Sequence, residues 1–238
     1  PTPRLGIVLS RGNAATDSFV RIKAKAAEKL GVELVREELS ENATAADAVA
    51  AVERLSKDCD GVIVQLPLSP SIDAEAVISA VPHELDVDRL NADGGAALAP
   101  VAGAMLEILD RHRVEIRGKK AIVIGKGRLV GRPCTSALRE RGAHVEVLTE
   151  GDSLDALADA DIVVSGAGES GLIKPDMIKD DVVLIDAGTS EQGGKLAGDA
   201  DPQCALKASV FTPVPGGVGP VAIAMIFKNL FALMEAKK

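Results

Sequence analysis

The sequence predicts an α/β protein of two domains, each a mostly parallel sheet with helices on both faces, with a cleft between them. Three observations predict this class. Apolar runs of strand length alternate with helical patterns along nearly all of the 238 residues, which is typical of parallel strands joined by crossover helices. Hydrophobic residues make up 47% of the chain, enough to bury sheets on both faces. An irregular stretch, residues 82–99, interrupts the alternation and indicates a domain junction or functional loop.

The first domain is predicted over residues 1–95. Its strands and helices are expected to alternate, in the order 5–9, 15–30, 33–37, 45–56, 62–65 and 74–80. Gly31 follows the first helix, where glycine commonly ends a helix as its C-cap. A proline-containing loop separates the last strand from the last helix of this series.

The second domain is predicted over residues 96–220 as a Rossmann-type dinucleotide-binding domain. A helix at 101–112 is expected to lead into four strands and two intervening helices. The strands are expected at 121–124, 145–148, 162–165 and 182–185, and the helices at 130–141 and 153–158. An apolar helical pattern from Val221 to Met234 lies beyond this domain. Residues 221–238 are expected to return and join the first domain.

Charge and composition narrow the functional class. The net charge of −8 disfavours a nucleic-acid partner. No apolar run is judged long enough to span a bilayer and no signal peptide is recognised, so no membrane partner is expected. Cys59, Cys134 and Cys204 are scattered without paired spacing, which predicts reduced thiols and a cytoplasmic location. The three histidines are equally dispersed, and no metal is expected.

The most distinctive stretch is the run TPVPGGVGP at residues 212–220. Proline fixes φ and removes backbone donors, whereas glycine lets the backbone approach a ligand closely. The run precedes an apolar helix, so its free amides are expected near a positive helix end. Pro215, Gly216 and Gly217 are therefore predicted to line a substrate site. The alternative is a rigid connector without a ligand.

A nucleotide site is predicted where a buried strand, residues 120–124, ends in Gly125. Gly131 would let the next helix approach the sheet and leave its first amides free for a pyrophosphate. The spacing is not G-x-G-x-x-G, so the position at the start of a βαβ unit carries the prediction. Cofactor contacts are expected at Gly125, Lys126, Gly127, Arg128, Leu129, Val130, Gly166, Ala167, Gly188 and Thr189.

The choice between NAD and NADP depends on the charges around this site. Glu150 follows the second strand of the domain, where an acid commonly accepts the ribose hydroxyls of NAD and repels the extra phosphate of NADP. Lys126, Arg128 and Arg132 favour the opposite choice, because any of them can pair with a phosphate. Each of these bases is also open to interpretation as ordinary solvated charge. NAD is the preferred prediction, with Glu150 as a cofactor contact.

A second group of polar residues lies in the first domain. Phe19 and Lys23 are four residues apart in a predicted helix and share one face. Gln65 lies at the carboxyl end of a strand, where open α/β sheets bind ligands, and Asp88 lies in the irregular stretch. Taken singly, these are also typical of a surface lysine, a capping amide and a turn aspartate. Spacing alone does not show that they converge.

Together, these segments resemble the bifunctional methylenetetrahydrofolate dehydrogenase/methenyltetrahydrofolate cyclohydrolase family. The matching runs, in the family's order, are 18–23 (SFVRIK), 61–68 (GVIVQLPL), 86–88 (DVD), 124–133 (IGKGRLVGRP), 185–188 (IDAG), 198–199 (GD) and 212–220. The resemblance implies two α/β domains, a homodimer formed through the nucleotide domain, tetrahydrofolate derivatives as substrates and NAD or NADP as cofactor.

The resemblance also implies an activity and residue roles. The enzyme would oxidise 5,10-methylenetetrahydrofolate with a nicotinamide cofactor and hydrolyse the methenyl product to 10-formyltetrahydrofolate. Lys23 would be the central catalytic residue, Gln65 its neighbour and Asp88 the carboxylate that holds the pterin, with Phe19 stacking nearby. A lysine beside a cationic carbon loses proton affinity and can relay protons around an attacking water.

Several positions depart from the family pattern. Phe19 stands where the family usually has tyrosine, Arg89 stands where glycine is common, and Gly127 replaces a serine of the nucleotide turn. These departures leave two alternatives open. One is a catalytically silent folate- or nucleotide-binding paralogue, and the other is a different NAD-dependent dehydrogenase on the same scaffold.

Overall fold

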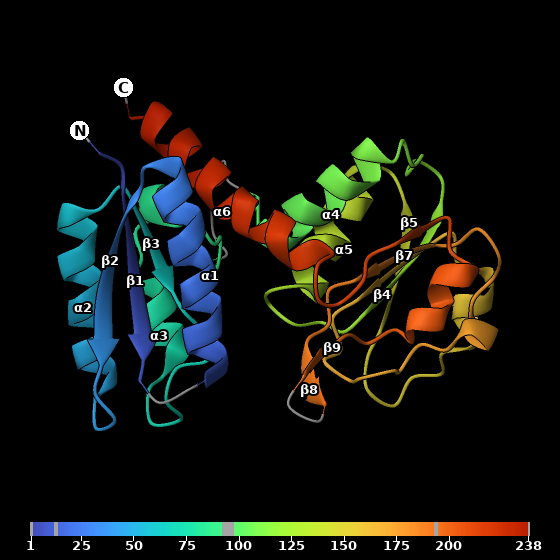
Figure 1. Cartoon of the computed structure of the whole chain (residues 1–238), viewed down its shortest axis with the longest axis horizontal. Helices are drawn as coiled ribbons and strands as arrows, with labels where there is room; N and C mark the ends of the chain where they lie inside the picture. The colour runs from blue at the N-terminus through green and yellow to red at the C-terminus, as the bar shows by residue number, and fades with distance from the viewer. Residues whose placement is uncertain (1, 12–13, 92–97, 193–194, 238) are drawn as a thin grey trace. The chain divides into compact units, whose positions relative to one another are not determined.

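The structure is a computed structural model that describes residues 2–11, 14–91, 98–192 and 195–237. The chain divides into two compact units, which are described separately (Figure 1). The first unit combines Pro1–Ala99 with Ile223–Lys238, and the second is Pro100–Ala222. The first unit therefore contains both chain ends.

The first unit is built on a three-stranded parallel sheet in the order β2-β1-β3. Its strands are β1 (Arg4–Ser10), β2 (Glu33–Leu39) and β3 (Gly61–Val64). Helix α1 (Ala14–Leu30) connects β1 to β2, and α2 (Ala45–Asp58) connects β2 to β3. A short helix, α3 (Ala74–Ser79), and a 3-10 turn, η1 (His83–Leu85), follow. This is the predicted alternation of strands and helices.

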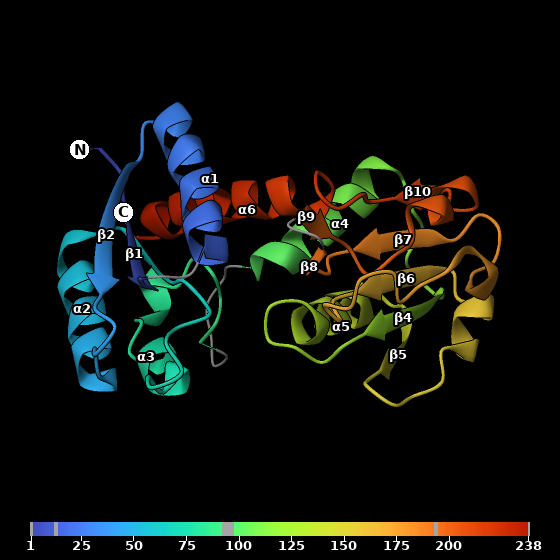
Figure 2. The same ribbon diagram turned by 60° about the horizontal axis from the view of Figure 1, so that its bottom comes forward.

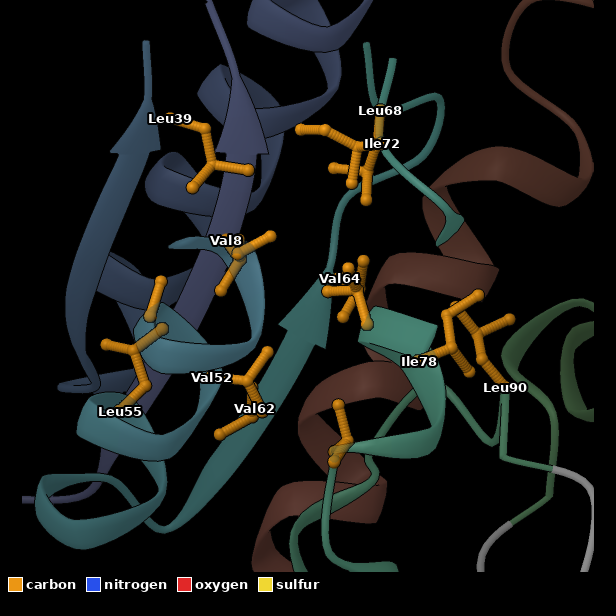
Figure 3. Close-up of a cluster of buried hydrophobic side chains, with 14 of the residues drawn as sticks. Val8, Leu39, Val52, Leu55, Val62, Val64, Leu68, Ile72, Ile78 and Leu90 are labelled. Atoms are coloured by element: carbon orange, nitrogen blue, oxygen red, sulfur yellow. The ribbon is translucent and has the colours of Figure 1, made fainter. Parts of the chain in front are cut away.

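Helix α2 begins where its first free amides find side-chain partners. The Thr44 hydroxyl accepts a hydrogen bond from the Asp47 backbone, and the Asp47 carboxylate accepts one from the Thr44 backbone. The helix then buries an apolar face that includes Val52 and Leu55. Together with α3, that face covers one side of the sheet, where Val8 and the other labelled residues of Figure 3 pack as one cluster.

The other side of the first sheet is covered by α1 and by the last helix, α6 (Val218–Glu235). Figure 2 shows α6 passing beside α1. Ile226, Phe227, Leu230 and Leu233 of α6 join the same buried cluster as residues of β1. The helix begins at Val218, three residues before the predicted start. Pro220 is accommodated because the first turn of a helix needs no backbone N–H from it.

By length and composition, α6 is apolar enough to cross a membrane. The prediction that no apolar run is long enough to do so is therefore wrong by this criterion. The core contacts of Phe227 and Leu230 account for the composition, since a buried core helix passes the same test. The helix is weak evidence for a membrane span.

The second unit contains a five-stranded parallel sheet in the order β10-β7-β6-β4-β5. The strands are β4 (Lys120–Ile124), β5 (His144–Leu148), β6 (Ile162–Ser165), β7 (Val183–Asp186) and β10 (Val210–Phe211). The helices are α4 (Pro100–Arg111) and α5 (Gly131–Glu140). The chain moves outward to β5 and then back past β4 to β6. A ligand site is expected at such a reversal of strand order.

The second unit departs from the prediction in several short elements. The predicted helix at 153–158 is instead a 3-10 turn, η2 (Asp155–Asp159), which buries only Leu157 and so lacks the apolar stripe of a longer helix. Two further 3-10 turns, η3 (Pro175–Met177) and η4 (Pro202–Leu206), were not predicted. Three short strands were also not predicted. They are β10 and the antiparallel pair β8 (Ser190–Gln192) and β9 (Lys195–Ala197), and they are too short to show an alternation of polar and apolar residues.

The three cysteines confirm one expectation from the sequence. Cys59, Cys134 and Cys204 are free and buried. Burial raises the pKa of the Cys59 thiol to about 11 and that of Cys134 to about 12. These thiols therefore stay protonated near neutral pH and pack as small apolar groups.

Candidate active site

Lys23 and Gln65 form a buried hydrogen-bonded pair in the first unit. The Lys23 side chain is only 7% exposed, and its Nζ donates to Gln65 Oε1 over 2.7 Å. Gln65 directly follows β3, and its backbone amide donates to Val8 of β1. Its side-chain Nε2 donates to the Leu66 carbonyl over 2.9 Å. With its N–H group occupied there, the Gln65 amide presents its oxygen to Lys23.

Asp88 is electrostatically coupled to this pair. Burial lowers the pKa of Lys23, and the negative charge of Asp88 raises it in part. Burial likewise raises the pKa of Asp88, while the charge of Lys23 lowers it. The first unit therefore brings together the three residues that were predicted to be catalytic. The chemistry available there is an amine of weakened basicity that is hydrogen-bonded to a neutral amide and electrostatically coupled to a carboxylate.

Asp88 follows a tight turn that is organised around the buried acid Asp86. Asp86 pairs with Val62 of β3 through a parallel bridge. The Asp86 carboxylate accepts hydrogen bonds from the backbone amides of Leu90, over 3.3 Å, and Asn91, over 2.8 Å. Burial raises the pKa of Asp86. The run DVD is visible in the sequence. That Asp86 organises the turn next to Asp88 could not be seen there.

Phe19 lies one helical turn before Lys23 on α1. Its side chain is 37% exposed, in contrast to the buried Lys23. The ring is therefore accessible to a ligand, as a stacking residue must be. Phenylalanine has no hydroxyl, so Phe19 offers an aromatic surface only.

The predicted nucleotide turn lies where β4, β6 and α5 meet. A Cβ atom on Gly131 would lie 2.1 Å from the Gly125 carbonyl oxygen, and one on Gly125 would lie 2.8 Å from the Gly166 carbonyl oxygen. A Cβ atom on Gly166 would lie 2.5 Å from Val130 Cγ1. Gly125 also has φ +97°, which favours glycine. These contacts require bare backbone at the reversal of strand order, which fits a site for a dinucleotide pyrophosphate.

Two buried aspartates organise the loops after β6 and β7. Asp199 accepts hydrogen bonds from the Ser165 hydroxyl at 2.6 Å and from the Ala167 and Glu169 amides at 2.8 Å. Asp186 accepts bonds from the Gly188 and Ala200 amides. Apart from the local bond between Gly188 and Asp186, spacing in the sequence gave no sign of these bonds, because each joins residues 14 or more positions apart.

Glycine is required at position 188 because its backbone touches the Asp199 side chain. A Cβ atom there would lie 2.0 Å from the Asp199 carboxylate carbon. Gly188 is buried and the adjacent Thr189 is exposed. Both follow β7, so they lie at the carboxyl edge of the sheet.

Lys126, Gly127, Arg128 and Leu129 form the turn between β4 and α5. Gly127 accepts a backbone hydrogen bond from Arg132 over 3.0 Å, which closes this turn onto the start of the helix. Leu129 is 46% exposed. The turn thus presents polar backbone and side chains beside the glycine contacts.

Glu150 lies on the surface just after β5. The next acid, Asp152, turns back and accepts hydrogen bonds from the backbone amide and hydroxyl of Thr149. These bonds lower the pKa of Asp152, and the charge of Lys126 contributes in the same direction. Asp152 was not singled out from the sequence, although its bonds to Thr149 shape the turn after β5.

A cavity of about 360 Å³ lies between α5 and β5. Its lining residues are Lys126, Gly131, Arg132, Thr135, Ser136, Arg139, Glu140 and Val147. Three of these are cations. Arg139 had not been singled out from the sequence, although it lies two helical turns after Arg132 and so shares its face.

The proline-glycine run belongs to the second unit and is tied to the end of β7. The Thr212 hydroxyl accepts a hydrogen bond from the Asp186 amide over 2.7 Å and donates to the Asp186 carbonyl over 3.2 Å. Gly216 has φ +109°, and the Gly217 amide donates to Pro213 over 2.7 Å. Helix α6 begins directly afterwards, at Val218. The predicted substrate residues Pro215, Gly216 and Gly217 thus form a fixed turn at a helix N-terminus.

Within the described ranges, no group of three or more histidine, cysteine, aspartate or glutamate side chains is arranged to hold a metal ion. The polar sites are instead the Lys23–Gln65–Asp88 group in the first unit and the glycine-lined turn in the second. Neither contains a histidine or a cysteine.

Comparison with known proteins matches both units. Residues 1–88 match the catalytic domain of tetrahydrofolate dehydrogenase/cyclohydrolase, and residues 99–238 match its NAD(P)-binding domain. A relative from Staphylococcus aureus, the bifunctional protein FolD, is 36% identical over 96% of this chain and 85% of its own length.

Two solved structures are similar over almost the entire chain. The bifunctional FolD of Campylobacter jejuni is 30% identical with a TM-score of 0.94, covering 100% of this chain and 89% of the other. The FolD of Trypanosoma brucei, solved with NADP and an inhibitor, is 33% identical with a TM-score of 0.91, covering 99% and 87%. The chain therefore belongs to the tetrahydrofolate dehydrogenase/cyclohydrolase family.

Proposed function

We propose that this protein is a bifunctional enzyme of folate one-carbon metabolism in which Lys23, Gln65 and Asp88 form the catalytic group. It oxidises 5,10-methylenetetrahydrofolate to 5,10-methenyltetrahydrofolate with NAD or NADP, and it hydrolyses that product to 10-formyltetrahydrofolate. The observation that carries the residue assignment is the buried Lys23–Gln65 hydrogen bond, with Asp88 coupled to it.

Lys23 is suited to move the proton in the hydrolytic step. Water adds its oxygen to the cationic methenyl carbon and must lose a proton as that bond forms. Burial lowers the pKa of Lys23, so its amine holds a proton less tightly, and the neutral amine can accept this one. It can then give this proton to the ring nitrogen as the carbon–nitrogen bond breaks, while the remaining hydroxyl proton leaves to solvent as the formyl C=O forms. One water is consumed, one proton is released and the amine is regenerated.

Gln65 and Asp88 would orient the reactants without adding a reactive group. The Gln65 oxygen restricts the Lys23 amine to one direction through the 2.7 Å bond. Asp88 offers two carboxylate oxygens, which can accept paired hydrogen bonds from neighbouring N–H groups of a pterin. The exposed ring of Phe19 is available to stack on the same ligand.

The second unit would supply the hydride acceptor. A nicotinamide dinucleotide held there would supply the acceptor for the hydride that leaves the methylene carbon of the substrate. The close backbone contacts among Gly125, Gly131 and Gly166 bring the end of β4 against the first turn of α5, whose amides would bind the pyrophosphate of the dinucleotide. We assign the loops containing Ala167, Gly188 and Thr189, together with the turn 126–130, to the rest of this site. Pro215, Gly216 and Gly217 are assigned to the substrate.

We assign NAD as the preferred cofactor because Glu150 follows β5, where an acid accepts ribose hydroxyls. The cavity lined by Lys126, Arg132 and Arg139 supports the opposite choice, since these cations can pair with a phosphate. The ratio of kcat/KM for the two cofactors decides between them. We also infer a cytoplasmic location, consistent with three unpaired cysteines.

The residue assignment is tested by comparing Lys23→Met with Lys25→Met. Both residues lie on α1, but Lys25 is exposed. Lys23→Met should abolish hydrolysis of the methenyl compound while leaving some hydride transfer, because only the first reaction needs the amine to move a proton. Lys25→Met should behave like the unchanged protein in both reactions.

The reactions are followed by the absorbance of the reduced cofactor and of the methenyl product. The chain has no Trp and no Tyr, so the protein itself absorbs little near 280 nm. Full hydrolysis by Lys23→Met would refute the assignment. Absence of turnover by the unchanged protein with either cofactor would favour a silent binding protein.

A further inference from the structure

The C-terminal helix carries a buried amide that contacts the Asp88 loop. Asn229 of α6 is only 7% exposed although its side chain is polar. Its Nδ2 donates to the Val87 carbonyl and to the Leu98 carbonyl, both over 2.8 Å. An amide NH₂ has two hydrogens, so both of its donors are used here. Val87 lies 142 residues before Asn229 in the sequence, and Leu98 lies 131 residues before it.

The Val87 carbonyl belongs to the segment that presents Asp88, whereas the Leu98 carbonyl lies ten residues after Asp88 in the sequence. Val87 directly precedes Asp88 and is fully buried. It also packs close to β3 and α6, because a Cβ atom on Gly61 would lie 2.6 Å from Val87 Cγ1 and 2.8 Å from Leu230 Cδ1. Strand β3, helix α6 and Val87 are thus in direct contact, and Asn229 adds a hydrogen bond between α6 and Val87.

From these contacts we infer that Asn229 is a positioning residue for the folate site, acting through Asp88. The turn that carries Asp88 is held on one side by the Asp86 carboxylate, which binds the Leu90 and Asn91 amides. Asn229 holds the other side through the carbonyl that precedes Asp88. A buried carbonyl without a donor is costly, so the chain would shift to find another partner if the amide were removed.

This inference rests on the proposed role of Asp88 and predicts a specific pattern of kinetics. Asn229→Leu keeps a similar volume but removes both donors. It should raise KM for 5,10-methylenetetrahydrofolate about tenfold, the size expected when one net hydrogen bond is lost. The Kd of the dinucleotide should not change, because both described bonds of Asn229 join residues of the first unit.

A double-mutant cycle separates positioning from general destabilisation. If Asn229 acts through Asp88, Asn229→Leu should add little to the KM increase caused by Asp88→Asn. Leu233→Ala, a cavity-forming change in the same helix, is the matched control. Leu233→Ala should lower stability as much as Asn229→Leu or more, but it should not raise the KM for 5,10-methylenetetrahydrofolate. Hydrogen exchange gives a readout without activity, since the Leu90 and Asn91 amides should exchange faster in Asn229→Leu.

Each outcome has a defined consequence. Multiplicative effects of Asn229→Leu and Asp88→Asn on KM, or a lower Tm with unchanged KM, would overturn the inference. An Asp88→Asn variant with unchanged KM would instead contradict the proposed role of Asp88. Should Asn229→Leu fail to fold, Asn229→Asp, which keeps the shape and loses the N–H donors, is taken through the same cycle.

Discussion

At the scale of single residues, the protein places ionisable groups where burial alters their proton affinity. In the first unit, burial lowers the pKa of Lys23 and raises those of Asp86 and Asp88. In the second, burial raises the pKa of Asp186, which is held by the Gly188 and Ala200 amides. Perturbed groups that are also coupled to one another are typical of functional sites. Lys23 and Asp88 meet both conditions.

The coupling predicts a change in Lys23 when Asp88 is neutralised. The negative charge of Asp88 favours the protonated amine, so Asp88→Asn should lower the pKa of Lys23 further. The pH dependence of Lys23 acylation by acetic anhydride, followed by mass spectrometry, should shift to lower pH. Asp17→Asn removes an exposed acid from the same helix and should leave the profile in place. An unchanged or higher midpoint in Asp88→Asn would contradict the coupling.

Asp199 provides a second prediction at this scale. Its carboxylate binds the Ala167 and Glu169 amides, so it sets the shape of the loop after β6. In Asp199→Asn, the side-chain NH₂ group would face one of these two backbone N–H donors, so one of the two hydrogen bonds would be lost. The Kd of the dinucleotide, measured by calorimetry, should rise about tenfold.

The control for this prediction is Asp201→Asn. Asp201 caps the nearby turn η4 by binding the Gln203 amide over 3.0 Å. Its contacts with Ile173 and Lys174 lie past the Ala167 and Glu169 amides that Asp199 binds. Asp201→Asn should leave the Kd of the dinucleotide unchanged. Equal Kd values for the two variants would show that Asp199 does not organise the cofactor loop.

At the scale of elements, α6 has two roles. Its apolar residues complete the core of the first unit, and Asn229 on the same helix binds the Asp88 segment. One side of the helix therefore supports both stability and the site. This explains why a helix at the end of the chain belongs with residues from its beginning.

Removing a large core side chain from α6 should destabilise the first unit. Phe227 is 1% exposed, and Phe227→Ala should lower the free energy of unfolding by about 3–5 kcal/mol. The exposed neighbour Lys228 provides the control, because Lys228→Ala should change it by less than about 0.5 kcal/mol. Denaturant unfolding followed by circular dichroism measures both values. A loss below about 1 kcal/mol for Phe227→Ala would argue against this packing.

At the scale of the whole molecule, each unit is an α/β assembly with its own core. The first is organised around β1, the central strand of its sheet, and the second around β4 and β6, where strand order reverses. We propose a homodimer formed through the second unit, from the family resemblance. Light scattering should then give twice the mass of one chain, and a monomer at micromolar concentration would contradict it.

Much of the architecture was predictable from local pattern. The alternation of strands and helices follows from side-chain periodicity, which each segment carries by itself. Strands β1, β3, β4 and β6 were predicted within one residue of their observed ends. The short elements β8, β9 and β10 were not, because two or three residues hold no period. The helix predicted at 153–158 became the turn η2 because too little of it is buried.

The candidate site was predictable only as a set of separate residues. The sequence itself determined that Lys23 lies in a helix, that Gln65 ends a strand and that glycines follow β4, since each property depends on neighbours along the chain. Only the tertiary structure decided that Lys23 meets Gln65 across 42 residues, and that Asn229 reaches Val87 across 142. Such contacts depend on the order of strands in the sheet and on where α6 packs, which no local pattern encodes.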